Sequence, residues 1–87
     1  MLYYVTLSNR KQADETVREM QIYDADNMYI CPLIAFSHLT DNDADLITLR
    51  LDLLTMCDKL IVASDVTPEM REEINLANRI GMEVEYL

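Results

Sequence analysis

The chain alternates strand-like apolar segments with segments that have the period of amphipathic helices. Residues 2–7, 29–31, 59–63 and 82–86 are rich in β-branched, aromatic and other apolar side chains, as strands are. Strands that alternate with helices of about ten to fifteen residues predict βαβ units with right-handed crossovers. Such units form a parallel sheet that helices cover on both faces.

The predicted fold is a three-layer α/β domain, Rossmann-like or flavodoxin-like, with about four parallel strands in the order 2-1-3-4. Residues 1–87 form a single domain, because the sequence contains no linker, internal repeat or low-complexity segment. The strand order reverses between strands 1 and 3, where open α/β sheets bind ligands outside the carboxyl ends of their strands. Ser8 and Asn9 are expected on one lip of this crevice, and residues 64–67 on the other.

Each of the first two helical segments has apolar side chains that are expected to form a buried face. The first places Ala13, Val17 and Met20 on one side. Asp41 or Asp43 suits the N-cap of the second. The side chains expected to form its buried stripe are Leu46, Leu49, Leu53 and Met56.

The last helical segment carries complete boundary signals and a carboxylate on its apolar face. Thr67 suits the N-cap, Pro68 the first helical position and Gly81 the left-handed stop. At about 100° per residue, Glu73 falls within the arc formed by Met70, Ile74, Leu76, Ala77 and Ile80. A carboxylate there costs free energy unless it is paired, hydrogen-bonded or beside a cleft. Glu73 is therefore either a reactive group or half of an ion pair with a basic residue.

Net charge, apolar segments, chain length and cysteine content limit the partners and the cellular location that we expect for this protein. A formal charge of −9 argues against direct binding to nucleic acid, because phosphates would be repelled. No segment is long and apolar enough to span a membrane and no secretion signal is evident, so a cytoplasmic protein without a membrane partner is expected. A chain of 87 residues has a modest core, which favours a homo-oligomer. Cys31 and Cys57 are expected to be buried and reduced, with no metal site.

The segment after the first strand could receive an anion. Ser8 and Asn9 open a helix, and Arg10 and Lys11 follow in its first turn, where they oppose the helix dipole unless they meet a negative group. The alternative is a solvated basic pair. The sequence has no glycine-rich phosphate loop, which excludes a standard dinucleotide site or P-loop, and no cofactor is expected.

Several other polar side chains are candidates for the crevice. Asp52, Asp58, Asp65 and Glu69 precede or follow the third strand, and carboxylates that converge can divide acid and base roles. An acidic solvated surface is the simpler interpretation. His38, the only histidine, lies beyond the second strand and could carry a proton or contact a ligand, although a lone loop histidine often does neither.

The order and spacing of these residues resemble a known family. Residues 57–62 lead into a strand, and Thr67, Met70, Glu73 and Ala77 then recur at fixed spacing before Gly81. Together with residues 30–38, and with Asp52 ahead of Asp58, this pattern is similar to the small domains of the nucleoside 2-deoxyribosyltransferase-like superfamily.

The resemblance implies a nucleoside-like ligand and possible N-glycosidic cleavage. Glu73 would be the nucleophile that holds the sugar covalently before water or another base takes it. Asp52 would assist the leaving base, and Asp65 and Thr67 would line the sugar or phosphate pocket. Our leading hypothesis makes Asp52 or Asp65 the acid/base partner of Glu73. Ser8, Asn9 and His38 are further candidate ligand contacts, because the predicted topology places them on the side of the crevice. Two carboxylates about 5 Å apart would suit such a retaining displacement. Glu69 stands where the family has glycine, which disfavours a 5′-phosphate and raises the alternative of a catalytically inactive, acidic protein-interaction module, for example one encoded by a phage or mobile element.

Overall fold

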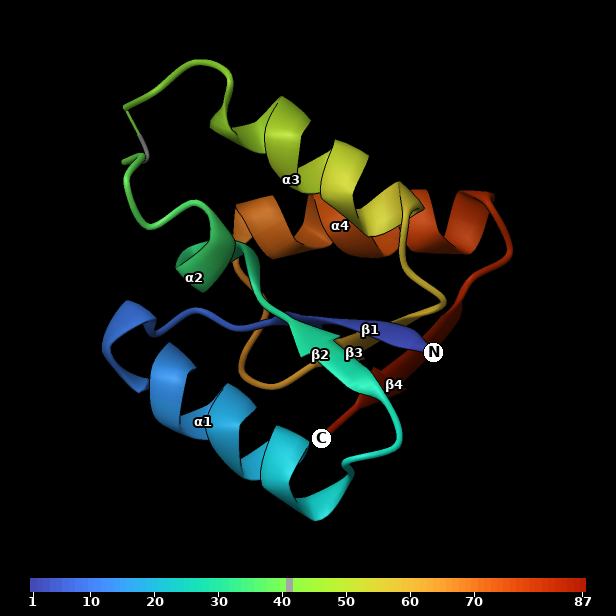
Figure 1. Ribbon diagram of the computed structural model, residues 1–87. Coiled ribbons are helices and arrows are strands. Elements are labelled where there is room, and N and C mark those ends of the chain that lie inside the picture. The colour runs from blue at the N-terminus through green and yellow to red at the C-terminus, as the bar shows by residue number, and fades with distance from the viewer. Residues whose placement is uncertain (41) are drawn as a thin grey trace.

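The computed structural model describes residues 1–40 and 42–87, which form a four-stranded parallel sheet with helices on both faces (Figure 1). The strands are β1 (Leu2–Thr6), β2 (Met28–Ile30), β3 (Lys59–Val62) and β4 (Glu83–Tyr86), in the order β2-β1-β3-β4. The helices are α1 (Arg10–Tyr23), α2 (Pro32–Ala35), α3 (Leu46–Thr55) and α4 (Pro68–Arg79). The predicted fold class and strand order are confirmed.

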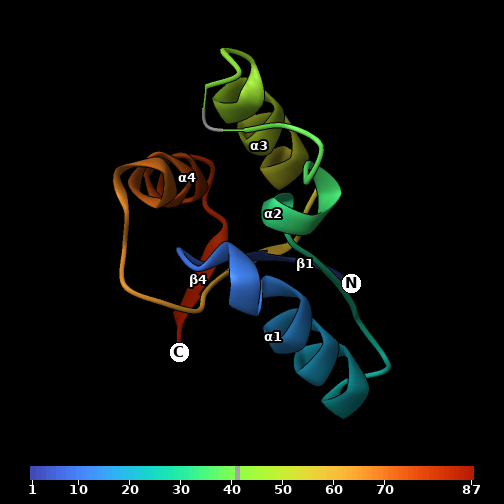
Figure 2. The same cartoon turned by 90° about the vertical axis from the view of Figure 1, so that its left-hand side faces the viewer.

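The sheet divides the core into two layers. Helix α1 lies against one face, while α3 and α4 lie side by side against the other (Figure 2). Alternate residues of the central strands pack into different core layers, because successive side chains of a strand point to opposite faces of the sheet. Tyr4 and Leu60 pack with α3 and α4, and Val5 and Ile61 pack with α1. No helix of the described residues is long and apolar enough to cross a membrane.

Helix α4 begins and ends as its sequence predicts. The Thr67 side chain accepts a hydrogen bond from the Met70 amide at 3.3 Å. At the other end Gly81 has φ +76°, and the Met82 amide donates to the Ala77 carbonyl at 2.8 Å, as in a Schellman motif. Ile80 was expected on the buried arc but is 49% exposed, because the helix ends before it.

Helix α3 buries a different face from the predicted one. Leu49 and Met56 are 36% and 70% exposed, whereas Leu46, Arg50 and Leu54 are buried. The helix is apolar on nearly all sides, so its sequence period does not select a face; packing against α4 and the sheet does. The N-cap of α3 is Asp45. The predicted cap Asp43 instead accepts a hydrogen bond from the Thr40 amide in the preceding turn. The other predicted cap, Asp41, lies outside the described residues.

The region after β2 also differs from its prediction. β2 ends at Ile30, and Cys31 is the N-cap of the short helix α2, which begins at Pro32 and was not predicted. Helices this short leave no period to detect, and only the proline at the first position marks this one. Cys31 and Cys57 are buried free thiols, as expected, and burial raises the pKa of Cys57 to about 11.

Substituting Gly81 should destabilise the domain through backbone strain alone. A Cβ at position 81 would meet no atom within 4 Å, but its φ of +76° is unfavourable for residues with side chains. We expect Gly81→Ala to lower the free energy of unfolding by about 1 kcal/mol in urea denaturation. Gly81→Asn should cost less, because asparagine tolerates the left-handed conformation. Equal losses in the two variants would contradict this explanation.

Candidate functional site

Glu73 is the centre of a buried polar network between α4, α3 and β1. Its side chain is fully buried, on the face of α4 that packs onto the sheet. Oε1 accepts from Thr6 Oγ1 at 2.6 Å and from Arg50 Nη2 at 3.0 Å. Oε2 accepts from the Tyr4 hydroxyl and from Arg50 Nε at 3.1 Å. Each carboxylate oxygen therefore accepts two hydrogen bonds.

One edge of the Arg50 guanidinium donates two hydrogen bonds to the carboxylate of Glu73. Nε and Nη2 donate to separate oxygens, which is the bidentate geometry in which arginine binds carboxylates most strongly. The side chain of Arg50 is itself only 6% exposed. Burial alone would lower the pKa of Arg50, but the hydrogen bonds and charge of Glu73 outweigh it, and the pKa lies above its ordinary value. Of the two interpretations of Glu73, the ion pair is confirmed.

Strand β1 supplies the two hydroxyl groups of the network. Tyr4 and Thr6 are two positions apart, so both point to the face of the sheet that α4 covers. Thr6 Oγ1 also accepts from Arg50 Nη2 at 3.3 Å, which makes it a bridge between the two charged partners. Burial raises the pKa of Tyr4 above its ordinary value, and the neighbouring Glu73 carboxylate raises it further. Tyr4 therefore remains a hydrogen-bond donor throughout the ordinary pH range.

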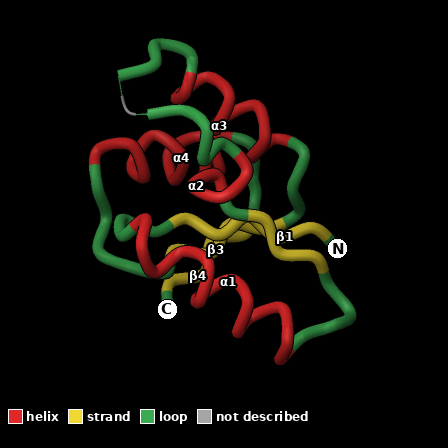
Figure 3. Tube along the Cα trace, turned by 60° about the vertical axis from the view of Figure 1, so that its left-hand side comes forward, coloured by secondary structure: helices red, strands yellow, loops and turns green. Residues whose placement is uncertain are grey.

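Two pockets open above this network, at the carboxyl ends of the strands. The strand-end pocket, of about 190 Å³, is lined by Leu7, Ser8, Arg10, Leu33, Arg50, Thr67 and Glu69. The α3–α4 pocket, of about 350 Å³, is lined by Asp43, Ala44, Leu46, Ile47, Arg50, Pro68, Glu69 and Glu72. Arg50 and Glu69 line both, so the pockets adjoin. The helices α1 and α4 cover opposite faces of the sheet, but both begin at this carboxyl end of the strands (Figure 3).

Three of the predicted ligand contacts lie at these pockets. Ser8 and Thr67 line the strand-end pocket, and Glu69 lines both. The Ser8 amide donates to Ser64 Oγ at 2.8 Å, so the loops after β1 and β3 meet as expected from the strand order. Thr67 and Glu69 occupy the start of α4, where the helix is anchored by its N-cap.

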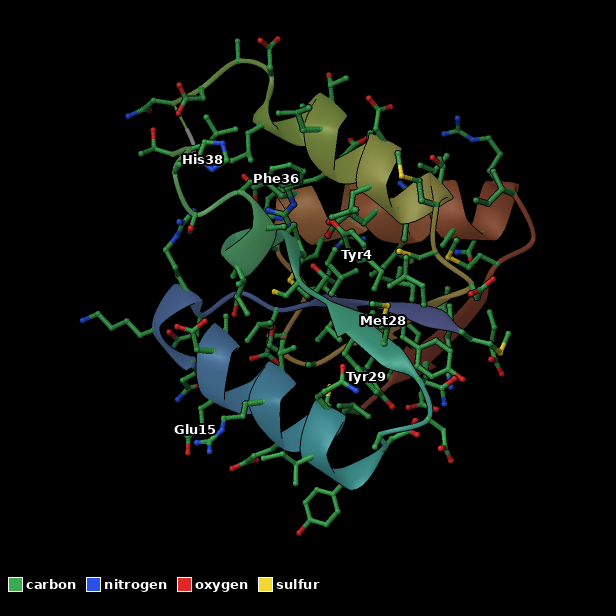
Figure 4. All side chains as sticks on the ribbon, viewed as in Figure 1. Tyr4, Glu15, Met28, Tyr29, Phe36 and His38 are labelled. Carbon is green, nitrogen blue, oxygen red and sulfur yellow. The ribbon has the colours of Figure 1, made fainter. Side chains whose placement is uncertain are left out.

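The other predicted site residues are not brought together with Glu73. Asp52 is exposed and lines neither pocket; it lies two residues after Arg50, which puts it on the opposite side of α3. Asp65 is also exposed, in the loop after β3. Asn9 is the N-cap of α1 and accepts from the Lys11 amide at 2.9 Å. His38 is exposed on the loop between α2 and α3, away from the Tyr4 side chain (Figure 4).

The principal residue missed from the sequence is Arg50. One signal could have revealed it: Arg50 is the only basic residue of α3, and Leu46 and Leu54 lie four positions before and after it. That spacing puts the guanidinium on the same face as the two leucines. Had this face been chosen as the buried one, Arg50 would have been the natural partner for the inward-facing Glu73.

Breaking the buried pair from either side should destabilise the fold strongly. We expect Glu73→Gln and Arg50→Met each to lower the free energy of unfolding by about 3–5 kcal/mol, because each leaves one buried charge without its partner. The double variant should lose less than the sum of the two losses, since neither charge remains. Urea denaturation measures all three. The matched control is Glu85→Gln, which breaks a partly exposed pair with Lys59 and should cost less than about 1 kcal/mol. Additive losses would contradict the coupling.

Alkaline pH should unfold the protein in step with ionisation of Tyr4. The unfolded chain ionises this tyrosine near pH 10.0, whereas its folded pKa is raised. The contribution to stability is therefore fully present below pH 10.0 and falls as the pH rises above it. In absorbance titration, one of the five tyrosines should ionise together with loss of far-ultraviolet circular dichroism, and Tyr4→Phe should lack that step. Ionisation of Tyr4 in protein that is still folded would contradict the network.

Comparison of the chain with protein-family models, with curated proteins and with solved structures found no match. The resemblance to the nucleoside 2-deoxyribosyltransferase-like superfamily therefore rests on the quoted residues and stays a prediction.

Proposed function

We propose that the protein binds a nucleoside-like small molecule in the crevice formed by the strand-end and α3–α4 pockets. The observation that carries the proposal is Arg50: a guanidinium, nearly all buried, that lines both pockets while its other edge is fixed by Glu73. A donor held rigidly at the base of a pocket can orient a ligand without losing side-chain entropy on binding. The crevice also lies at the reversal of strand order, the usual binding place in this architecture.

The walls of the crevice suit the two halves of a nucleoside. Ser8 and Thr67 carry hydroxyl groups at the strand-end pocket, next to Arg10, and can contact sugar hydroxyls. Leu46, Ile47 and Pro68 supply apolar surface in the larger α3–α4 pocket, which can cover the faces of a base. Pockets of about 300 Å³ and more are typical for small-molecule ligands.

The same contacts argue against cleavage by Glu73 in this arrangement. A carboxylate nucleophile needs an oxygen that faces the anomeric carbon, with a free lone pair. Both oxygens of Glu73 accept two hydrogen bonds each, and the side chain has no exposed surface. Arg50 lines the pockets and holds Glu73 beneath them, so attack would require the ion pair to open. We therefore assign Glu73 to positioning Arg50, and the binding function does not depend on turnover.

Nucleoside binding should appear as localised shifts in the NMR spectrum of the labelled protein. Titration with a panel of nucleosides should move the amide signals of Ser8, Thr67 and Glu69, and leave those on the outer face of α1 unchanged. Arg50→Lys keeps the charge but loses the planar fork, so it should weaken binding by about tenfold or more while the circular dichroism spectrum is retained. Absence of any shift with every nucleoside would overturn the proposal and favour the protein-interaction alternative.

The same mixtures test the role of Glu73 when they are analysed by chromatography for free base. No release is expected from the wild-type protein. Release by wild type that is absent from a folded Glu73→Gln preparation would show that the ion pair opens and that Glu73 reacts. Equal release by both preparations would indicate a contaminating hydrolase.

A further inference from the structure

One edge of the Arg50 guanidinium has no partner among residues 1–40 and 42–87. Nε and Nη2 donate to Glu73 and Thr6. Nη1 has no hydrogen-bond partner among the described residues, although every fully buried side-chain nitrogen and oxygen there has one. Nη1 therefore retains solvent-accessible surface, and Arg50 lines both pockets. Because guanidinium N–H groups are strong donors, this edge can donate to an acceptor on a ligand, and to water when no ligand is bound.

The rim of the α3–α4 pocket determines which acceptor is suitable. Asp43, Glu69 and Glu72 place three carboxylates around its opening, while the charge of Arg50 is already balanced by Glu73. An incoming phosphate or carboxylate would be repelled by the rim without meeting an unbalanced positive charge at the base. A neutral acceptor is not repelled by the rim and needs no unbalanced positive charge at the base of the pocket. Of the neutral acceptors of a base, a carbonyl oxygen projects beyond the ring, whereas a ring nitrogen is recessed between its ring neighbours. The acceptor that suits Nη1 best is therefore a carbonyl group.

The carboxylates of Glu69 and Glu72 can accept hydrogen bonds from a donor group at the other end of the ligand. No described residue donates a side-chain hydrogen bond to Glu69 or Glu72, and both are exposed on the first turns of α4. Their free oxygens can accept from an amino group. A ligand that fills the pocket would satisfy both ends if it carries a carbonyl oxygen on its inner edge and an exocyclic amine toward the rim.

We propose that the α3–α4 pocket selects nucleosides whose base carries both a carbonyl oxygen and an exocyclic amino group, as cytosine and guanine do. The carbonyl accepts from Arg50 Nη1, and the amino group donates to Glu69 or Glu72. Adenine lacks the carbonyl, and thymine lacks the amine. This inference rests on the proposed function, since it assigns the base of the bound nucleoside to one of the two pockets.

Calorimetric titration with deoxycytidine, deoxyguanosine, deoxyadenosine and thymidine tests the preference. We expect the first two to bind at least about tenfold more tightly than the last two, as loss of one hydrogen bond to a charged partner implies. The double variant Glu69→Ala and Glu72→Ala should abolish the advantage over thymidine but keep the advantage over deoxyadenosine, because Arg50 is unchanged.

The matched control removes two carboxylates from the other layer of the molecule. Glu15 and Glu19 are exposed on α1, and Figure 4 shows Glu15 on that helix, far from α3 and α4. Glu15→Ala with Glu19→Ala changes the net charge equally and should leave the preference intact. Equal affinity of wild type for all four nucleosides would overturn the inference and leave the proposed function standing, as would an unchanged preference in the Glu69/Glu72 variant. Binding of none of them would overturn both.

Discussion

The ion pair between Arg50 and Glu73 is the interaction on which the structure depends. It joins α3 to α4, and through Tyr4 and Thr6 it also joins both helices to β1, although these elements are far apart in sequence. Burial of two charges is costly, and it is offset here only because every carboxylate oxygen has two donors and the guanidinium has a bidentate partner. The network therefore tolerates few alternative arrangements of the three elements. It fixes the rotation of α3, whose own apolar pattern does not.

This network also sets the chemistry of the crevice above it. Glu73 would be a reactive carboxylate if it faced the pocket, but with all its acceptor positions occupied it acts as a clamp on Arg50. The consequence is a rigid donor at the base of a pocket whose rim is acidic. In the proposed binding function, recognition depends on the guanidinium edge that no described residue occupies, on the carboxylates of α4 and on the apolar side chains between them. The strand-end pocket adds hydroxyl groups and Arg10 on the side of β1.

Much of the fold was predictable because its signals are local. Strand periodicity, the Thr67 cap and the Gly81 stop each depend on a few neighbouring residues, and the parallel order then follows from the alternation of strands and helices. The candidate site was less predictable. Asp52 is near Arg50 in sequence but points away from it, since two residues along a helix lie on opposite sides. Asp65 follows β3 and His38 follows the short helix α2, and both are exposed in their loops.

The sequence by itself determined the α/β class, the strand order, the ends of α4 and the inward position of Glu73. Those features follow from side-chain period and from capping, which act within one element. Only the tertiary structure decided which face of α3 is buried, that Arg50 is the partner of Glu73 and that Tyr4 and Thr6 complete the network. A nearly uniform apolar helix has no preferred face of its own, so the rotation that pairs its single arginine with a buried carboxylate is selected by the cost of leaving either charge alone.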